Sequence, residues 1–186
     1  SAEGIGRMLR AAMADASVST ILLDVDSPGG TVTGVSELAE ELFEMRGKGK
    51  KIVAQVNGLA ASAAYWLASQ ADEIVSLPSG LAGSIGVFTV HQNLAAALEK
   101  EGVDVTVISA GKYKVEGNPF EPLSDEAKAV KQAQVDEAYG QFVKDVARGR
   151  GVTASAVRSG YGEGRVLTAK DAKAAGLIDR IGTMED

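Results

Sequence analysis

The chain has 186 residues, of which 45% are hydrophobic and 24% are charged, as in a globular domain with a buried core. Its formal charge of -6 argues against nucleic-acid binding, because phosphate recognition needs a basic face. The sequence contains no cysteine, which excludes thiol catalysis and disulfides, and one histidine, which excludes a multi-histidine metal site. No apolar run reaches the ~18 residues of a membrane span, and the first residues lack a signal-peptide pattern, although an upstream anchor stays undecided.

The first hundred residues alternate between strand and helix patterns. Apolar spacing predicts helices over about 4–16, 35–46, 61–70 and 94–100, and strands over 21–25, 52–56, 73–77 and 103–108, with a turn entering a further strand over 83–90. The strands are apolar on both sides, which is typical of parallel sheets covered by helices. We therefore expect an α/β fold with a mostly parallel sheet.

The rest of the chain is predicted to be largely helical. Residues 109–122 form the longest irregular stretch, and long ordered loops are often functional. A long helix is expected from Ser124 to about Arg148, then shorter helices after Thr153 and over 169–175, and a final short strand over 177–179.

Ser62 is the candidate nucleophile. It follows an apolar strand and sits among small residues at the start of a predicted helix, where unpaired backbone N–H groups can stabilise a developing negative charge. The alternative is that Ser62 only caps this helix. The small residues 59–61 beside it favour small or apolar substrate side chains next to the scissile bond.

A serine nucleophile needs a base, and the sequence offers a histidine or lysines. His91 has no evident carboxylate to orient it, and the Gly-x-Ser-x-Gly pattern of α/β-hydrolases is absent. A lysine can act as base if burial lowers its pKa by roughly three units. Lys112 and Lys114 lie in the irregular stretch beside Tyr113; the alternative is that both are solvated loop lysines.

Four motifs in order resemble the S49 peptidases, which include bacterial signal peptide peptidases and phage head-maturation proteases. The resemblance covers about residues 5–181 and rests on Asp26-Ser27-Pro28-Gly29-Gly30, Ala60-Ala61-Ser62-Ala63-Ala64-Tyr65-Trp66, Gly83-Ser84-Ile85-Gly86-Val87, and Gly111-Lys112-Tyr113-Lys114 with Gly117-Asn118-Pro119-Phe120. It implies a ClpP/crotonase-like fold, a single S49 peptidase-like domain over 1–186, and a Ser/Lys catalytic dyad without a metal or cofactor.

The resemblance also implies roles for individual residues. Ser62 matches the nucleophile and Lys114, 52 positions later, the general base. The N–H groups of Gly30 and Ala63 would form the oxyanion hole. Gly29 would shape the turn, and Ser84 would hydrogen-bond the base.

Two departures from the family bear on function. Bacterial signal peptide peptidases usually carry Gly-Gly at the positions of Ala63-Ala64. The two alanines instead resemble the phage and prophage branch. The family also begins with one or two strands before the first helix, so the chain resembles a protease core lacking them.

The expected function is therefore an endopeptidase that matures phage capsid or scaffold protein in the host cytoplasm or prohead. A signal-peptide hydrolase associated with the membrane is the alternative. A crotonase-like acyl-CoA enzyme and an inactive oligomerising module are alternatives of other classes. The polypeptide substrate is the expected partner, and the long helix and residues 177–178 favour a homo-oligomer.

Overall fold

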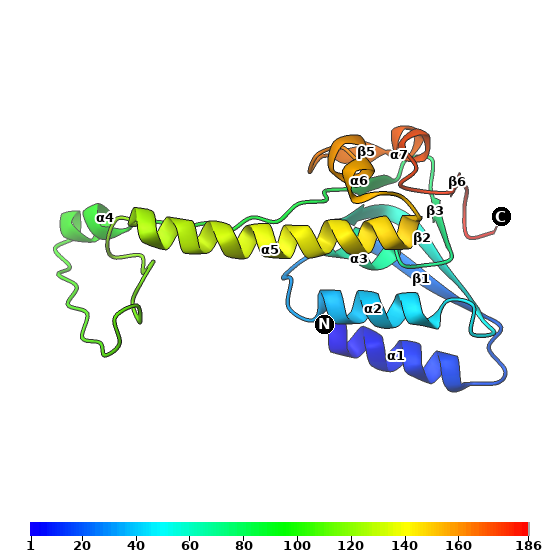
Figure 1. Cartoon of the computed structure of the whole chain (residues 1–186), viewed down its shortest axis with the longest axis horizontal. Coiled ribbons are helices and arrows are strands. Elements are labelled where there is room, and N and C mark those ends of the chain that lie inside the picture. Colours follow the sequence, from blue (N-terminus) through cyan, green and yellow to red (C-terminus); the bar gives the residue numbers. More distant parts are fainter. Residues whose placement is uncertain (186) are drawn as a thin grey trace. The chain divides into compact units, whose positions relative to one another are not determined.

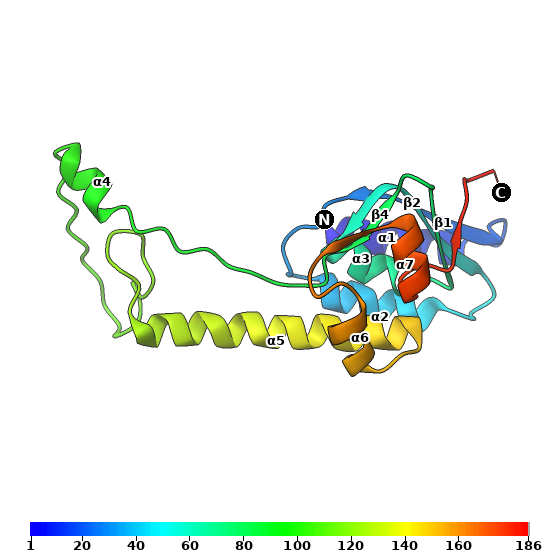
Figure 2. The same ribbon diagram turned by 90° about the horizontal axis from the view of Figure 1, so that it is seen from above.

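The computed structural model describes residues 1–185 and divides the chain into two compact units. The first unit comprises residues 1–86 and 139–186, and the second comprises residues 87–138. Each unit is described by itself below. Elements are labelled in Figures 1 and 2.

A curled sheet in the first unit is built around one long strand, β2 (Lys51–Ala61). Its apolar side chains are buried on both faces, as the sequence pattern predicts. β1 (Thr20–Ser27) pairs in parallel along one edge of β2. Two strands share the opposite edge of β2. β3 (Glu73–Ser76) pairs in parallel with its first half, and β4 (Leu81–Gly83) pairs in parallel with its end.

Two short strands complete this sheet. β5 (Val166–Thr168) pairs antiparallel with β4, and β6 (Arg180–Ile181) pairs in parallel with β3. The final strand was predicted over 177–179, which is wrong. Leu177 still donates its N–H to Ala172 of the preceding helix, and the paired residues of the strand are Arg180 and Ile181. Asp179 leads into this strand, since its N–H donates to the Ile74 carbonyl and its carboxylate accepts the Ile74 N–H.

Helices of the first unit enclose the core beside the sheet. They are α1 (Ala2–Ala14), α2 (Val35–Met45), α3 (Ala63–Ala68), the C-terminal half of α5 (Asp125–Arg150), α6 (Ala154–Gly160) and α7 (Ala169–Ala175). α1 lies beside α2, where Arg10 forms an ion pair of 2.7 Å with Glu41 (Figure 1). The core between the layers is filled by fully buried side chains that include Leu42, Ile52, Tyr65, Ile74, Phe142 and Leu177.

The second unit contains α4 (Ala95–Lys100) and the first half of α5. Two predictions are wrong here, the strand that was to follow the turn within 83–90 and the strand over 103–108, because residues 87–90 and 103–108 form no strand. Residues 87–90 are rich in β-branched and aromatic side chains, and residues 103–108 alternate between apolar and polar ones. Such patterns form a strand only where a neighbouring backbone accepts its hydrogen bonds. Val103 instead donates its N–H to Leu98 at the end of α4.

Candidate active site

Ser62 lies at the turn between β2 and α3 with a strained backbone. Its φ of 53° and ψ of -127° lie in a region that non-glycine residues rarely adopt, at a cost of about 1–3 kcal/mol. Its N–H donates to Gly83 (2.9 Å), and its carbonyl accepts the N–H of Trp66 (2.9 Å). The interpretation as a simple cap is wrong, since the Ser62 side chain makes no capping hydrogen bond. A half-buried serine held on such a turn has the backbone setting of a nucleophile.

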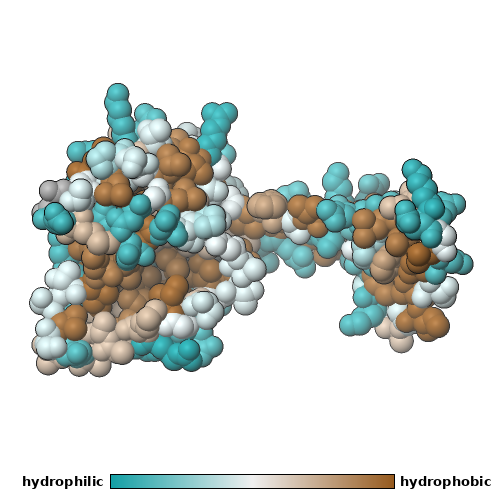
Figure 3. Space-filling view, turned by 180° about the vertical axis from the view of Figure 1, so that it is seen from behind, coloured by the Kyte–Doolittle hydropathy of each residue, from teal (hydrophilic) through white to brown (hydrophobic). Residues whose placement is uncertain are grey.

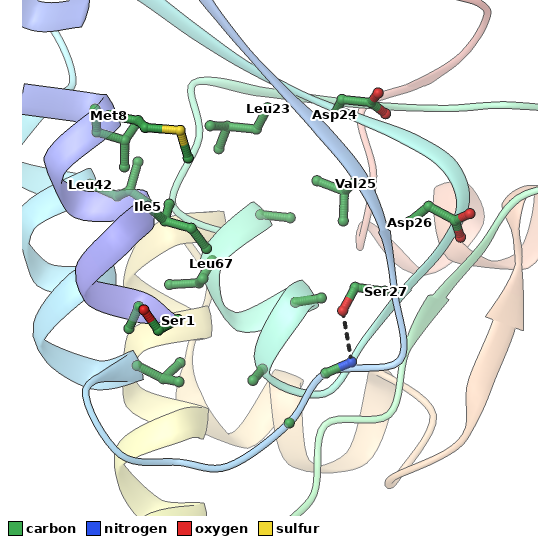
Figure 4. A pocket seen from close by; sticks show the side chains of 18 of the residues that line it. Ser1, Ile5, Met8, Leu23, Asp24, Val25, Asp26, Ser27, Leu42 and Leu67 are labelled. Atoms are coloured by element: carbon green, nitrogen blue, oxygen red, sulfur yellow. Dashed lines mark hydrogen bonds between the residues drawn. The ribbon is translucent and has the colours of Figure 1, made fainter. Parts of the chain in front are cut away.

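The Gly29 backbone packs directly against Ser62. A Cβ added at Gly29 would lie 2.7 Å from Ser62 Cβ and 2.9 Å from Ala63 N, and Gly29 has a φ of 100°. The Gly29 N–H donates to Ser27 Oγ (3.2 Å), as Figure 4 shows. This turn therefore requires glycine because of both contact and conformation.

Gly30 differs from its neighbour. An added Cβ at Gly30 would meet no atom within 4 Å. Within residues 1–185, neither the N–H of Gly30 nor that of Ala63 donates a hydrogen bond, and both residues line the same groove. The resemblance assigns the oxyanion hole to these two amides, and that role stays a prediction; within residues 1–185 neither amide has a partner that would compete with a ligand.

Ser84 is brought beside Ser62 by the register of the sheet. Ala61 of β2 pairs with Gly83 of β4 in parallel. Ser62 and Ser84 are the residues that immediately follow this pair on the two strands. Ser84 has a φ of 55° and donates its N–H to Arg165 (2.8 Å). The structure thus gathers Ser62, Gly29, Gly30, Ala63 and Ser84 within the first unit.

The candidate bases belong to the second unit. Lys114 is exposed on a turn in which its N–H donates to Gly111 (3.1 Å), and its amine makes no ion pair or hydrogen bond within the described part of the chain. Lys112 Nζ instead contacts the Tyr113 hydroxyl (2.7 Å), which donates to Glu126 (3.0 Å). The His91 ring is bonded to the Asn118 carbonyl (2.9 Å). The pairing of Lys114 with Ser62 stays a prediction.

An apolar groove of about 740 Å³ extends across the first unit from Gly29, Gly30 and Ala63, and Ser62 itself is not among its lining residues. Its lining comes from α1, β1, the loop that follows β1, α2 and α3, and Figure 3 shows an apolar hollow on this unit. In Figure 4, Leu23 and Val25 of β1 face Ile5 and Met8 of α1. None of residues 59–61 lines this groove, and Ala60 and Ala61 are buried in β2, so a role of these residues in specificity stays a prediction.

Over residues 1–185, no cluster of three or more metal-ligating side chains occurs. Over the same residues, no helix combines the length and apolarity needed to cross a bilayer.

Comparison with known proteins identifies the family. The model of peptidase family S49 matches residues 44–186. A protein of Methanocaldococcus jannaschii named as a protease is 40% identical over 92% of this chain and 55% of its own length. The capsid assembly protease C of Escherichia phage lambda is 36% identical over 96% of this chain and 40% of its own length. A protein of Enterococcus faecium named as signal peptide peptidase SppA is 34% identical over 92% of this chain and 50% of its own length.

The chain spans about half the length of these relatives, or less. The family model nevertheless covers more than half of the chain and includes Ser62, Ser84 and Lys114. By sequence, this chain belongs to peptidase family S49.

Proposed function

We propose that the chain is an endopeptidase with Ser62 as nucleophile and Lys114 as general base, built on a ClpP/crotonase-like fold as one S49 peptidase domain. The observation that carries this proposal is the strained backbone of Ser62, whose side chain does not cap α3, together with the N–H groups of Gly30 and Ala63, which have no hydrogen-bond partner within residues 1–185. A serine, two free amides and an adjoining groove are the parts that acyl transfer from a peptide requires.

The reaction would proceed in two stages. The reaction requires that Lys114, which is exposed within the second unit, is shielded from solvent and neutral when it meets Ser62. It then accepts the proton of the Ser62 hydroxyl while Oγ attacks the peptide carbonyl, and the Gly30 and Ala63 amides donate to the resulting oxyanion. Lys114 then returns the proton to the amine as the C–N bond breaks, which leaves an ester on Ser62. Water attacks this ester with Lys114 again as base, and Ser62 is regenerated. Ser84 would hold the Lys114 amine toward Ser62.

The groove supports a preference for apolar substrates. Its lining beside Ala63 includes Ala64 and Leu67 of α3, so an apolar side chain next to the scissile bond would be buried there. We propose capsid or scaffold protein as the substrate, in the host cytoplasm or prohead, since one relative is named as a capsid assembly protease. Signal peptides at a membrane are the second candidate, since another relative is named as a signal peptide peptidase.

Three variants test the dyad. Ser62→Ala and Lys114→Ala should abolish cleavage of an unfolded polypeptide, whereas Lys112→Ala, two positions from the proposed base, should retain it. A fluorophosphonate should label Ser62 of the parent protein, identified by mass spectrometry of the modified peptide. Turnover by folded Lys114→Ala would refute the dyad. Failure of the parent to form a Ser62 adduct would favour a crotonase-like reaction or an inactive module.

We also propose that the chain forms a homo-oligomer. Within the second unit, Phe88, Val90 and Ile108 are 85%, 67% and 94% exposed, and such an apolar surface favours association. Light scattering should give a mass at least twice that of the 19.2 kDa chain. Replacing Phe88 and Ile108 together by Ser should reduce this mass. A parent protein that remains monomeric at micromolar concentration would contradict the proposal.

A further inference from the structure

α3, which follows Ser62, packs against the C-terminal half of α5 within the first unit (Figures 1 and 2). The Trp66 indole Nε1–H donates to Asp145 Oδ2 (2.9 Å), and its ring stacks on Phe142 with centroids 4.3 Å apart. Gln70 Nε2 donates to the Asp145 carbonyl (3.0 Å). These contacts define a clamp between the two helices.

Asp145 is the polar centre of this clamp and is itself buried, with 1% of its surface exposed. Its other carboxylate oxygen accepts the Gln141 amide (2.9 Å), and the Arg148 guanidinium lies 3.6 Å away. A buried carboxylate is costly unless each oxygen has a partner. The side chains around Asp145 therefore hold it in one position, and it holds Trp66.

Trp66 connects the clamp to the nucleophile. Its backbone N–H donates to the Ser62 carbonyl (2.9 Å), so Trp66 is bonded at its backbone to Ser62 and at its ring to Asp145. The strained conformation of Ser62 persists only if its surroundings hold it. Gly29 and Gly83 restrain Ser62 from the sheet side, and Trp66 restrains it from the α3 side.

We infer that Asp145 is a positioning residue for the Ser62 turn, acting through the Trp66 indole and the Trp66–Ser62 backbone hydrogen bond. The expected effect of Asp145 on catalysis rests on the proposed function. The structural part of the inference, that Asp145 restrains the Ser62 backbone, stands on the contacts themselves.

Three variants separate positioning from simple core packing. Asp145→Asn keeps an acceptor for the indole, whereas Asp145→Leu has similar size and no acceptor. Trp66→Phe keeps an aromatic ring on Phe142 and removes the donor. Because Trp66 is the single tryptophan in the chain, its fluorescence reports on the clamp in the two Asp145 variants.

The first readout needs no substrate. Hydrogen exchange at the Ser62 and Trp66 amides should be faster in Asp145→Leu and Trp66→Phe than in the parent, with core amides such as that of Ile74 unchanged. In Asp145→Asn the Ser62 and Trp66 amides should exchange as in the parent. If Asp145→Leu does not fold, Trp66→Phe decides the same question. Equal exchange of both amides in a folded variant that lacks the hydrogen bond would overturn the inference.

The second readout is the rate at which Ser62 is phosphonylated by a fluorophosphonate, with loss of fluoride, and acylated by a peptide substrate. Small displacements of a reacting group cost up to about a hundredfold, so Asp145→Leu should lower kcat by at least about tenfold with KM nearly unchanged. Asp145→Asn should restore most of this rate. A loss confined to KM, or no loss in folded Asp145→Leu, would contradict positioning. If the parent itself forms no Ser62 adduct, the proposed function fails, and hydrogen exchange still decides the role of Asp145.

Discussion

Gly29→Ala tests whether the Ser62 turn depends on close backbone contact. The new Cβ would lie 2.7 Å from Ser62 Cβ, 2.8 Å from the Ala61 carbonyl oxygen and 2.9 Å from Ala63 N. All three are backbone or Cβ atoms, which cannot move aside as a flexible side chain can. The substitution must therefore displace either the residues after β1 or Ser62 itself.

The cost has two parts. A left-handed conformation costs an L-residue about 1–2 kcal/mol, and overpacking costs about 1–3 kcal/mol, so the free energy of unfolding should fall by about 2–5 kcal/mol. For a chain of this size, each kcal/mol corresponds to about 2–4 °C, which predicts a Tm lower by about 4–20 °C. This loss is a large part of an ordinary stability of about 5–15 kcal/mol.

Gly30→Ala is the matched control, because an added Cβ there meets open space at a φ outside the left-handed region. Thermal unfolding by circular dichroism should show a Tm within a few degrees of the parent for Gly30→Ala and the full decrease for Gly29→Ala. Fluorophosphonate labelling of Ser62 should fall in Gly29→Ala below its Tm. A Gly29→Ala protein with parent stability and parent labelling would refute the reasoning about this contact.

Two further substitutions probe the framework of the first unit. Burial raises the pKa of Tyr65 well above 10.0, and its hydroxyl donates to the Leu177 carbonyl (2.9 Å). Tyr65→Phe should therefore cost about 1–3 kcal/mol in urea unfolding at pH 7. Because the unfolded tyrosine ionises first, this phenol also makes the parent lose stability as pH rises above 10.0, a loss that Tyr65→Phe should lack. For Asp179, burial acts to raise the pKa, but hydrogen bonds from Arg150 and from the Ile74 N–H outweigh it and hold the pKa below 3.8. The ionised Asp179 therefore stabilises the folded state above pH 3.8, and Asp179→Asn should be less stable than the parent at pH 7, with the difference narrowing as pH falls below 3.8. A difference independent of pH would contradict the assigned role of this ion pair.

The sequence predicted the elements that carry their own periodic signal. The helix over 169–175 was predicted with its observed bounds, and α1, α2 and α5 within about two residues. Each begins near a capping or acidic residue and buries one apolar face, which are local signals. β1 and β2 were located but extended further than predicted, because pairing along their shared edge continues past the apolar runs.

Features that depend on distant partners could not be predicted. The alternation over 103–108 favoured a strand, yet no strand pairs with it among the described residues. The Ser62 hydroxyl fits a cap by residue type, but capping needs an extended backbone at that position, whereas Ser62 has a φ of 53° where it packs against Gly29. Trp66 and Asp145 are 79 positions apart, and no local pattern connects them.

The parallel sheet explains why motifs scattered along the sequence meet at one place. Ser27 pairs with Ala60, and Ala61 pairs with Gly83, so β1, β2 and β4 end at the same edge. The residues immediately following these strands are the turn with Gly29, then Ser62, then Ser84. Parallel strands carry their following loops to a shared edge, which is where α/β proteins place ligands. The helices that return the chain between strands therefore set the spacing of these motifs along the sequence. The shared edge of the sheet brings the motifs together, so that their side chains and backbone amides can act on one ligand.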